Sequence, residues 1–225
     1  MTLKSIEKWI RTRIKNRHNR IYLRNPAGKL RRIWWAPSGL RINFQGRDNR
    51  VILGEQCRFR HCRFNVIGQN NLIDIDNSAY NIIGFNVLLA NGSDRKIIIG
   101  ADFSSESCEV ILVEDGSSLQ IGKDCMFSSQ ITLRNSDSHN ILDAQSGEIL
   151  NAGPKHICLG DHVWAGYRCT FLKNIAVGNN CIIGANSVVT KQFNQDCVAI
   201  AGSPARIVKT GINWNRNLGL PKSKR

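Results

Sequence analysis

The 225-residue chain lacks the features of several large protein classes. No apolar run approaches the ~20 residues that a membrane-spanning helix needs. The stretch MTLKSIEKWIRTRIK carries charges where a secretory signal would be apolar. None of the eight cysteines form a Cys-Xaa-Xaa-Cys pair, and without a secretion signal we expect reduced thiols. The sequence therefore predicts a cytoplasmic protein, with the inner face of the cytoplasmic membrane as a variant of that location.

Acidic residues are scarce at both ends of the chain. Residues 1–50 hold 14 Lys/Arg against 2 Asp/Glu, a net charge of +12, and residues 206–225 hold 6 against none. Residues 51–205 hold 11 against 15, a net charge of −4. A nucleic-acid module concentrates positive charge on its folded binding surface. Because the basic character belongs to the ends, no nucleic-acid partner is expected.

A period of six residues dominates the second half of the chain. From residue 159 the blocks LGDHVW, AGYRCT, FLKNIA, VGNNCI and IGANSV follow one another. Their first positions are mostly aliphatic and their fifth positions are small or β-branched. A period of six fits neither a helix nor a two-faced strand. It predicts a short strand and a turn, repeated and stacked, with Gly or Asn relieving the turn conformation. Cys125, Cys169 and Cys181 occupy fifth positions, where we expect them to pack as small hydrophobic residues.

The pattern divides the chain into three regions. Residues 1–38 are expected to form a basic N-terminal helix, over residues 3–21, and a connecting segment. Residues 39–205 are expected to form the β domain. Within that domain the six-residue frame breaks over 139–156, which predicts a projecting loop. Residues 206–225 read as a basic tail.

Four stretches resemble the hexapeptide-repeat acyltransferases, and among them the bacterial polysaccharide O-acetyltransferases. They are IGKDCMFSS, NSDSHNILDAQSGEILN, LGDHVWAGYRCTFLKNIAVGNNCIIGANSVVTK and AIAGSPARIVKTGINWNR. The resemblance is looser over 39–120 and absent over 1–38. It implies an all-β fold, a left-handed parallel β-helix with three hexads to a coil. It also implies a homotrimer with active sites between subunits.

The resemblance implies acetyl transfer from acetyl-CoA to a hydroxyl of a capsule or O-antigen polysaccharide, or of its precursor, without a metal. His139 in SDSH occupies the family's catalytic position. A histidine there would act as general base on the acceptor hydroxyl, by direct attack and without an acyl-enzyme. Asp137 would either orient the imidazole or serve as a turn residue. His156 and His162 are weaker candidates, and His162 is expected to point outward.

Further residues match the family's acetyl-CoA contacts. Trp164 matches the tryptophan beside the CoA arm and acetyl group, and Tyr167 matches a position whose backbone contacts that arm. Tyr167 replaces the family's usual small residue. The remaining matches are Ala185, Thr190 and Lys191, followed by Arg206 and Lys209 as cations for the CoA phosphates.

Three other functions remain open at this stage. An amino-sugar N-acetyltransferase would share the CoA half of the site. A non-catalytic β-helix could bind anionic glycan through the basic ends. A γ-type carbonic anhydrase would need three converging histidines, and the spacing of His139, His156 and His162 does not match that family. The basic residues 1–24, with Trp9, could also associate peripherally with an anionic membrane.

Overall fold

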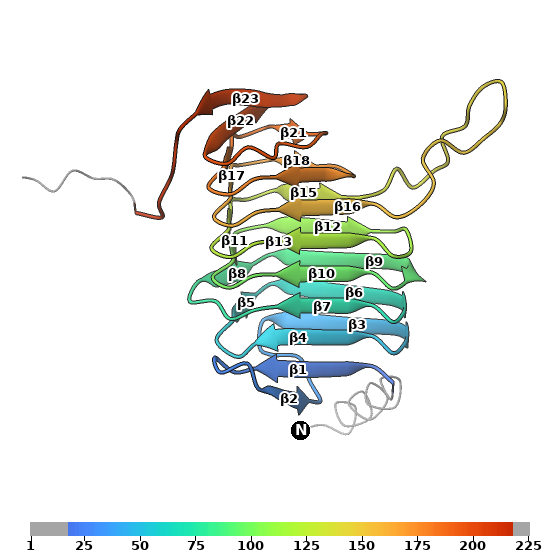
Figure 1. Ribbon diagram of the computed structural model, residues 1–225. Helices are drawn as coiled ribbons and strands as arrows, with labels where there is room; N and C mark the ends of the chain where they lie inside the picture. Colours follow the sequence, from blue (N-terminus) through green and yellow to red (C-terminus); the bar gives the residue numbers. More distant parts are fainter. Residues whose placement is uncertain (1–17, 218–225) are drawn as a thin grey trace, which may run out of the picture.

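The computed structural model describes residues 18–217, which form a three-sided stack of parallel coils (Figure 1). The predicted N-terminal helix falls mostly on residues 1–17, outside the described residues. Its expected last residues, Arg20 and Ile21, lie in a strand instead. No helix occurs anywhere in residues 18–217.

Three sheets form the sides of the stack. The first sheet, in spatial order, holds β19 (Ile175–Val177), β16 (His156–Leu159), β13 (Ser118–Ile121), β10 (Lys96–Ile99), β7 (Leu72–Ile75), β4 (Arg50–Gly54), β1 (Arg20–Arg24) and β2 (Leu30–Ile33). The second holds β21 (Val188–Val189), β18 (Thr170–Phe171), β15 (Ile131–Arg134), β12 (Cys108–Leu112), β9 (Phe85–Ser93), β6 (Cys62–Gln69) and β3 (Leu40–Arg47). The third holds β23 (Ala205–Thr210), β22 (Val198–Gly202), β20 (Ile182–Ile183), β17 (Trp164–Ala165), β14 (Met126–Phe127), β11 (Ser104–Ser105), β8 (Asn81–Ile83) and β5 (Arg58–Arg60).

The chain visits the second, first and third sheets in that order, and each circuit adds one strand to each sheet. All the strand pairs of the stack are parallel except the hairpins β1–β2 and β22–β23 at its two ends. The first parallel strand, β1, pairs with β4 in the first sheet. The stack therefore begins at Arg20 rather than at the expected residue 39, and it extends through β23 into the segment expected to be a tail.

Each hexad buries its first and fifth residues, as the period predicts. Leu159 and Val163 are buried in the hexad that begins at residue 159. Phe171 and Ile175 are buried in the hexad that begins at residue 171. The left-handed backbone of each turn falls on the fourth position, at His162, Arg168, Asn174, Asn180 and Asn186. Asparagine therefore relieves the turn as expected, whereas the glycines at the second position do not adopt the left-handed conformation, and that half of the expectation is wrong. They are needed because the next coil lies too close for a Cβ. A Cβ on Gly160 would lie 2.7 Å from Asn179 Oδ1 and 2.9 Å from the backbone of Gly178.

The core is one continuous apolar column. Six phenylalanine rings follow one another along it with centroid separations of 5.1 to 6.4 Å, mostly edge to face, as aromatic quadrupoles prefer: Phe59, Phe64, Phe85, Phe103, Phe127 and Phe171. Cys125, Cys169 and Cys181 are fully buried within the same cluster, which confirms their packing role.

A buried polar ladder runs along the edge between the second and first sheets. Asn49 Oδ1 accepts hydrogen bonds from the backbone N–H and side-chain amide of Asn71, at 3.0 and 2.9 Å. Asn71 Oδ1 in turn accepts from the backbone N–H and Nε of Arg95, both at 3.1 Å. The guanidinium of Arg95 is fully buried, and it donates to the carbonyls of Leu112 and Ile67 among others. Burial lowers the pKa of Arg95, and the carbonyls compensate its charge.

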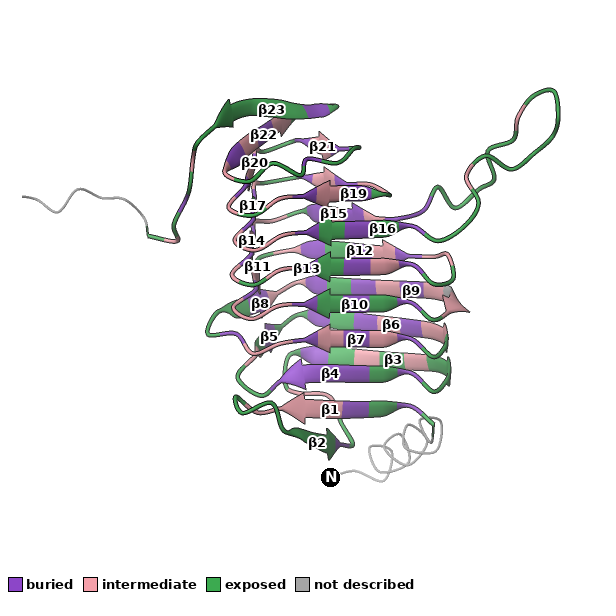
Figure 2. Cartoon of the chain, in the orientation of Figure 1, coloured by how far each residue is buried: buried purple, intermediate pink, exposed green. Residues whose placement is uncertain are grey.

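The predicted projecting loop leaves the stack between β15 and β16 and stands out from it in Figure 1. Figure 2 shows that it is mostly exposed. A bridge between Leu142 and Ile149 ties its two arms together. Four of its apolar side chains are about half exposed or more: Ile141, Leu142, Ile149 and Leu150. The loop therefore carries an apolar surface away from the core.

The close approach between coils predicts that Gly160→Ala destabilises the protein. The added methyl overlaps the next coil's backbone, and overpacking of this kind costs about 1–3 kcal/mol. Gly184→Ala is the matched control, because Gly184 also occupies the second position of a hexad, and the atom nearest to a Cβ there is the Ala201 Cβ at 3.0 Å rather than backbone. Thermal unfolding should show a clearly lower Tm for Gly160→Ala than for the control. Equal Tm values would contradict the close-approach explanation.

Candidate functional site

His139 stands at the root of the projecting loop, five residues beyond the end of β15. Hydrogen bonds fix the turn before it. Arg134 donates to the carbonyl of Ser136 at 3.0 Å and to Ser138 Oγ at 2.8 Å, and Ser136 Oγ donates to Glu114 Oε1 at 2.7 Å. His139 itself is exposed, and its ring has no hydrogen-bond partner among the described residues. A turn fixed by hydrogen bonds therefore presents an exposed imidazole at the base of the loop.

Asp137 faces the loop rather than the imidazole of His139. Its Oδ2 accepts a hydrogen bond from Asn151 Nδ2 at 2.8 Å and forms an ion pair with Lys173 Nζ. The Asn151 hydrogen bond and then the Lys173 contact lower the pKa of Asp137. Asn151 Nδ2 also donates to the carbonyl of His139 at 2.9 Å. No hydrogen bond between Asp137 and the His139 ring occurs in residues 18–217, so the orienting role stays a prediction.

Trp164 lies on a different side of the stack. It begins β17 in the third sheet, and its side chain is exposed beside Met126 and Ile182 of the neighbouring strands. Tyr167 follows at the turn from the third to the second sheet, where it is exposed. Ala185 occupies the equivalent turn one coil further on and is exposed as well. Gly166 precedes Tyr167 at the first of these turns, so small residues and one large exposed ring share this edge of the stack.

The four remaining predicted contacts divide between two places. Arg206 and Lys209 lie on β23, opposite Ala201 and Ala199 of β22, and both are exposed at the end of the third sheet. Thr190 and Lys191 follow β21 at the turn from the second to the first sheet. That is the edge from which His139 and its loop arise. The predicted residues thus form two groups on two different edges of one chain.

His162 lies outside the apolar core, as expected, but other residues cover its ring. Its Nδ1 lies 2.6 Å from Asp124 Oδ2, and its Nε2 lies 2.9 Å from the carbonyl of Trp214. The indole of Trp214 stacks on the imidazole with centroids 4.1 Å apart, and Trp214 Nε1 donates to the carbonyl of His162 at 2.8 Å. The sequence does not predict this cover, because Trp214 comes from the C-terminal segment, 52 residues later.

That C-terminal segment, residues 211–217, runs back down the stack after β23 (Figure 1). Arg216 anchors it by donating to Asp124 Oδ1 at 2.9 Å, to Ser104 Oγ at 2.7 Å and to the carbonyl of Cys125 at 3.1 Å. Its guanidinium also lies 4.0 Å from the centre of the Tyr80 ring. We call residues 211–217 the strap.

The strap meets the predicted CoA side of the chain. The ring centroid of Trp214 lies 6.0 Å from that of Trp164, at an angle of 47°. The Trp214 side chain therefore borders one side of the exposed Trp164 indole. The motif GINWNR marks this segment in the sequence, but its contacts cannot be inferred without the fold.

The cysteines and acidic residues do not form a reactive or metal-binding centre in the described part of the chain. All eight cysteines are free thiols. Burial raises the pKa of Cys125 to about 12 and that of Cys57 to about 11, which keeps both thiols protonated. No cluster of three potential metal ligands is found in residues 18–217. No helix in that range is long and apolar enough to cross a membrane.

Comparisons with known proteins agree with this geometry. The profile of the family described as "Bacterial transferase hexapeptide (six repeats)" matches residues 159–191. The polysialic acid O-acetyltransferase of Neisseria meningitidis is 34% identical over 173 residues, which cover 77% of this chain and 78% of that protein. The crystal structure of the polySia-specific acetyltransferase NeuO superposes with a TM-score of 0.72 at 27% identity, covering 91% of this chain and 92% of NeuO. For the polysialic acid O-acetyltransferase OatWY the TM-score is 0.63 at 30% identity, covering 79% of this chain and 92% of OatWY.

The fold and these relatives place the chain in the bacterial hexapeptide-repeat transferases. Its stack is therefore the left-handed parallel β-helix of that family, as predicted. Within the family it belongs to the polysaccharide O-acetyltransferase branch, and it is an acetyltransferase.

The strap predicts that Arg216→Ala weakens both stability and CoA binding. The change removes an ion pair and three hydrogen bonds from a largely buried guanidinium, at a cost of about 2 kcal/mol. It also releases Trp214 from its position beside Trp164. Arg60→Ala is the control, since Arg60 is exposed on β5. Thermal unfolding and CoA titration should both separate the two variants. An Arg216→Ala protein with an unchanged Tm and unchanged CoA affinity would contradict the anchoring role.

Proposed function

We propose that the protein transfers the acetyl group of acetyl-CoA to a hydroxyl of a capsule polysaccharide, with His139 as general base. The exposed His139 ring, which follows a hydrogen-bonded turn and has no hydrogen-bond partner within residues 18–217, is the observation that carries the proposal. The names of the relatives, polysialic acid O-acetyltransferases, support a capsule polysaccharide as the acceptor class.

The distribution of the site residues supports an active site between two copies of the chain. His139, Thr190 and Lys191 occupy the edge between the second and first sheets. Trp164 and Tyr167 lie on the third sheet and its far edge. One chain does not bring the two groups together, whereas a cyclic oligomer places one edge of each copy against another edge of its neighbour. We propose a homotrimer, in which the exposed apolar loop contributes to the contact.

The residues of the second group suit acetyl-CoA as the donor. Trp164 offers an exposed aromatic surface to the acyl end, and Gly166 and Ala185, at successive turns of the same edge, leave room for the pantetheine arm. Arg206 and Lys209 are exposed cations on β23 and can pair with phosphates. In the reaction, His139 accepts the proton of the acceptor hydroxyl as its oxygen attacks the thioester carbonyl. The CoA thiolate then leaves and takes up the proton that His139 releases.

The place of the reaction follows from the donor. Acetyl-CoA is a cytoplasmic metabolite, so we propose that acetylation precedes export of the glycan. Peripheral membrane association through residues 1–24 remains a separate proposal, because residues 1–17 lie outside the described part of the chain. Deleting residues 1–17 and measuring association with anionic vesicles tests it, and unchanged association would refute it.

The base role predicts that His139→Ala lowers turnover without unfolding the protein. General-base catalysis contributes roughly 10²–10⁴-fold, so acetyl transfer to capsule polysaccharide should fall by that factor. CoA affinity and Tm should stay near wild type, because the His139 ring makes no contact that supports the fold. His156→Ala is the control, since His156 is also exposed but begins β16, where its Nδ1 lies 2.8 Å from Ser118 Oγ. Turnover lost equally in both variants, or kept in His139→Ala, would contradict the assignment.

The split site predicts complementation between two inactive variants. Trimers assembled from a mixture of His139→Ala and Trp164→Ala chains contain interfaces that combine an intact His139 with an intact Trp164. Random mixing restores roughly a quarter of the interfaces. Activity should therefore reappear when the two purified variants are unfolded and refolded together. Mixed trimers as inactive as either variant alone would show that each site lies within a single chain.

A further inference from the structure

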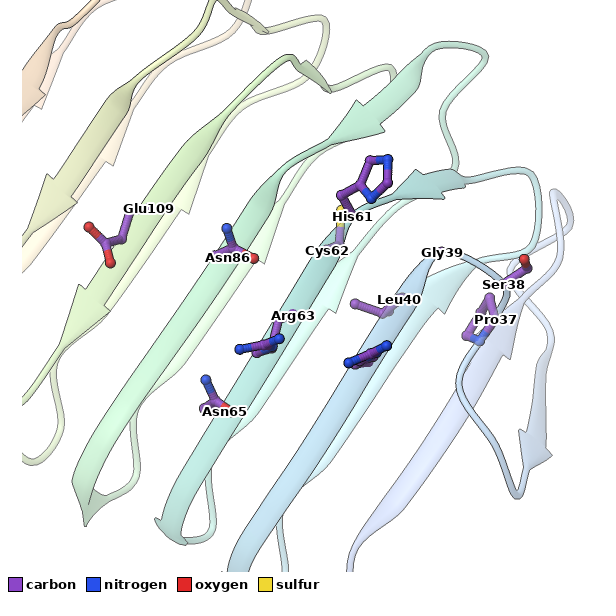
Figure 3. Close-up of a pocket in the computed structure, with 11 residues that line it drawn as sticks. Pro37, Ser38, Gly39, Leu40, His61, Cys62, Arg63, Asn65, Asn86 and Glu109 are labelled. Atoms are coloured by element: carbon purple, nitrogen blue, oxygen red, sulfur yellow. The ribbon is translucent and has the colours of Figure 1, made fainter. Parts of the chain in front are cut away.

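A hollow of about 910 Å³ lies on the second sheet, several coils below His139 (Figure 3). Its rim is the turn Pro37–Ser38–Gly39, and its floor carries side chains from four successive strands, β3, β6, β9 and β12. Arg41 and Arg63 lie opposite each other in the register of β3 and β6. Asn86 follows opposite Arg63, and Glu109 lies opposite Asn86. None of the CoA or base residues described above lines this hollow.

The two arginines carry charge that the described residues leave uncompensated. Like charges opposite each other on neighbouring strands are destabilising. Other arginines near this end of the stack have carboxylate partners: Arg24 pairs with Asp74, and Arg31 with Glu55. Within residues 18–217 no carboxylate lies within ion-pair distance of Arg41 or Arg63. Both arginines are exposed, and each guanidinium can bind a carboxylate through two parallel hydrogen bonds.

The rest of the hollow suits a sugar better than a phosphate backbone. Asn65 and Asn86 line it, and Asn43 donates to Asn65 at 2.9 Å. Amides both donate and accept, as sugar hydroxyls do. Glu109 at the upper end can accept hydrogen bonds from hydroxyls and repels anions, so the acidic groups of a ligand would lie beside the arginines and its hydroxyls beside Glu109. This combination of two cations, several amides and one carboxylate fits a polymer whose acidic groups are spaced among hydroxyls.

The second sheet continues from the hollow to β15, which precedes His139. A second column of side chains follows the register from Asn43 through Asn65, Leu88 and Ile111 to Arg134. Arg134 is the residue that holds the turn before His139. The four strand steps from β3 to β15 span about 19 Å, more than one sugar residue can bridge. A chain of several sugars lying along the second sheet reaches from the hollow toward His139.

We propose that this hollow is an acceptor subsite that binds a carboxylate-bearing polysaccharide several sugar units away from the acetylated residue. The proposal rests on the proposed function for the direction in which the polymer runs. It predicts that long acidic acceptors bind more tightly than short ones, because only a long chain occupies both the hollow and the catalytic edge.

The test compares two double variants of the full-length protein. Arg41→Gln/Arg63→Gln removes the subsite charges. Arg20→Gln/Arg50→Gln is the matched control, because Arg20 and Arg50 also face each other on neighbouring strands but belong to the first sheet. The probes are polysialic acid, polygalacturonic acid, a polysialic acid dimer, neutral dextran and a single-stranded oligonucleotide. Binding is measured without acetyl-CoA, acetyl transfer is measured with it, and CoA affinity reports the fold.

We expect at least one of the two acidic polysaccharides to bind the wild type and His139→Ala equally, and dextran not to bind. Arg41→Gln/Arg63→Gln should weaken that binding on the order of tenfold, the loss expected for charge-assisted hydrogen bonds. The KM for the long acceptor should rise by a similar factor with kcat unchanged, and the KM for the dimer should not change. The control variant should stay within twofold of wild type.

Several results would overturn the proposal. If both double variants lost the same amount of glycan binding, the effect would come from net charge rather than from this hollow. If the oligonucleotide bound more tightly than the acidic polysaccharides, the ligand would be a nucleic acid. If neither acidic polysaccharide bound to the wild type, a carboxylate-bearing polysaccharide would be ruled out as the ligand. Acetyl transfer with an unchanged KM in Arg41→Gln/Arg63→Gln would leave the enzyme assignment intact and refute the subsite. Arginine-dependent glycan binding without acetyl transfer would support the subsite and refute the proposed function.

Discussion

The in-register parallel stacking of one coil on the next is the constraint on which the structure depends. Each hexad leaves its apolar side chains half covered until another coil packs above it. The stacking brings the glycine of one coil within van der Waals contact of the next, aligns the phenylalanine column, and extends the Asn49–Asn71–Arg95 ladder. A residue's height and side on the stack therefore follow from its position in the repeat, and the polar ladder opposes slippage of one coil against another.

This regularity also explains how function is arranged. Two departures from the repeat carry residues of the proposed site: the loop inserted after β15, which presents His139, and the strap after β23, whose Trp214 lies beside Trp164. The loop leaves from one edge of the prism and the strap descends along another. The two proposed halves of the site are thus separated within one chain, and in the proposed trimer a neighbouring copy brings them together. The flat second sheet between the hollow and the loop remains available for an extended acceptor.

The sequence predicts the repeat well because periodicity is local. Leu159, Val163 and the buried cysteines could be placed from their positions in the hexads, and the loop from the break in the frame. The role of Gly160 could not be predicted from the sequence. The atoms that leave no room for a Cβ there belong to Gly178 and Asn179 in the adjacent coil. The cover over His162 could not be predicted for the same kind of reason, since Trp214 comes from a segment outside the repeat. The pairing of Arg41 with Arg63 depends on the register between β3 and β6. It could not be predicted, because the early repeats do not follow a strict six-residue period.

The central claim is that one acetyl-transfer site is assembled from two copies of the chain. A structure of the protein bound to CoA tests this claim most directly. The account predicts CoA in a cleft between neighbouring copies, with its thiol end between Trp164 of one copy and His139 of the next, and its phosphates near Arg206 and Lys209. CoA bound within a single chain, or with its thiol remote from His139, would contradict it.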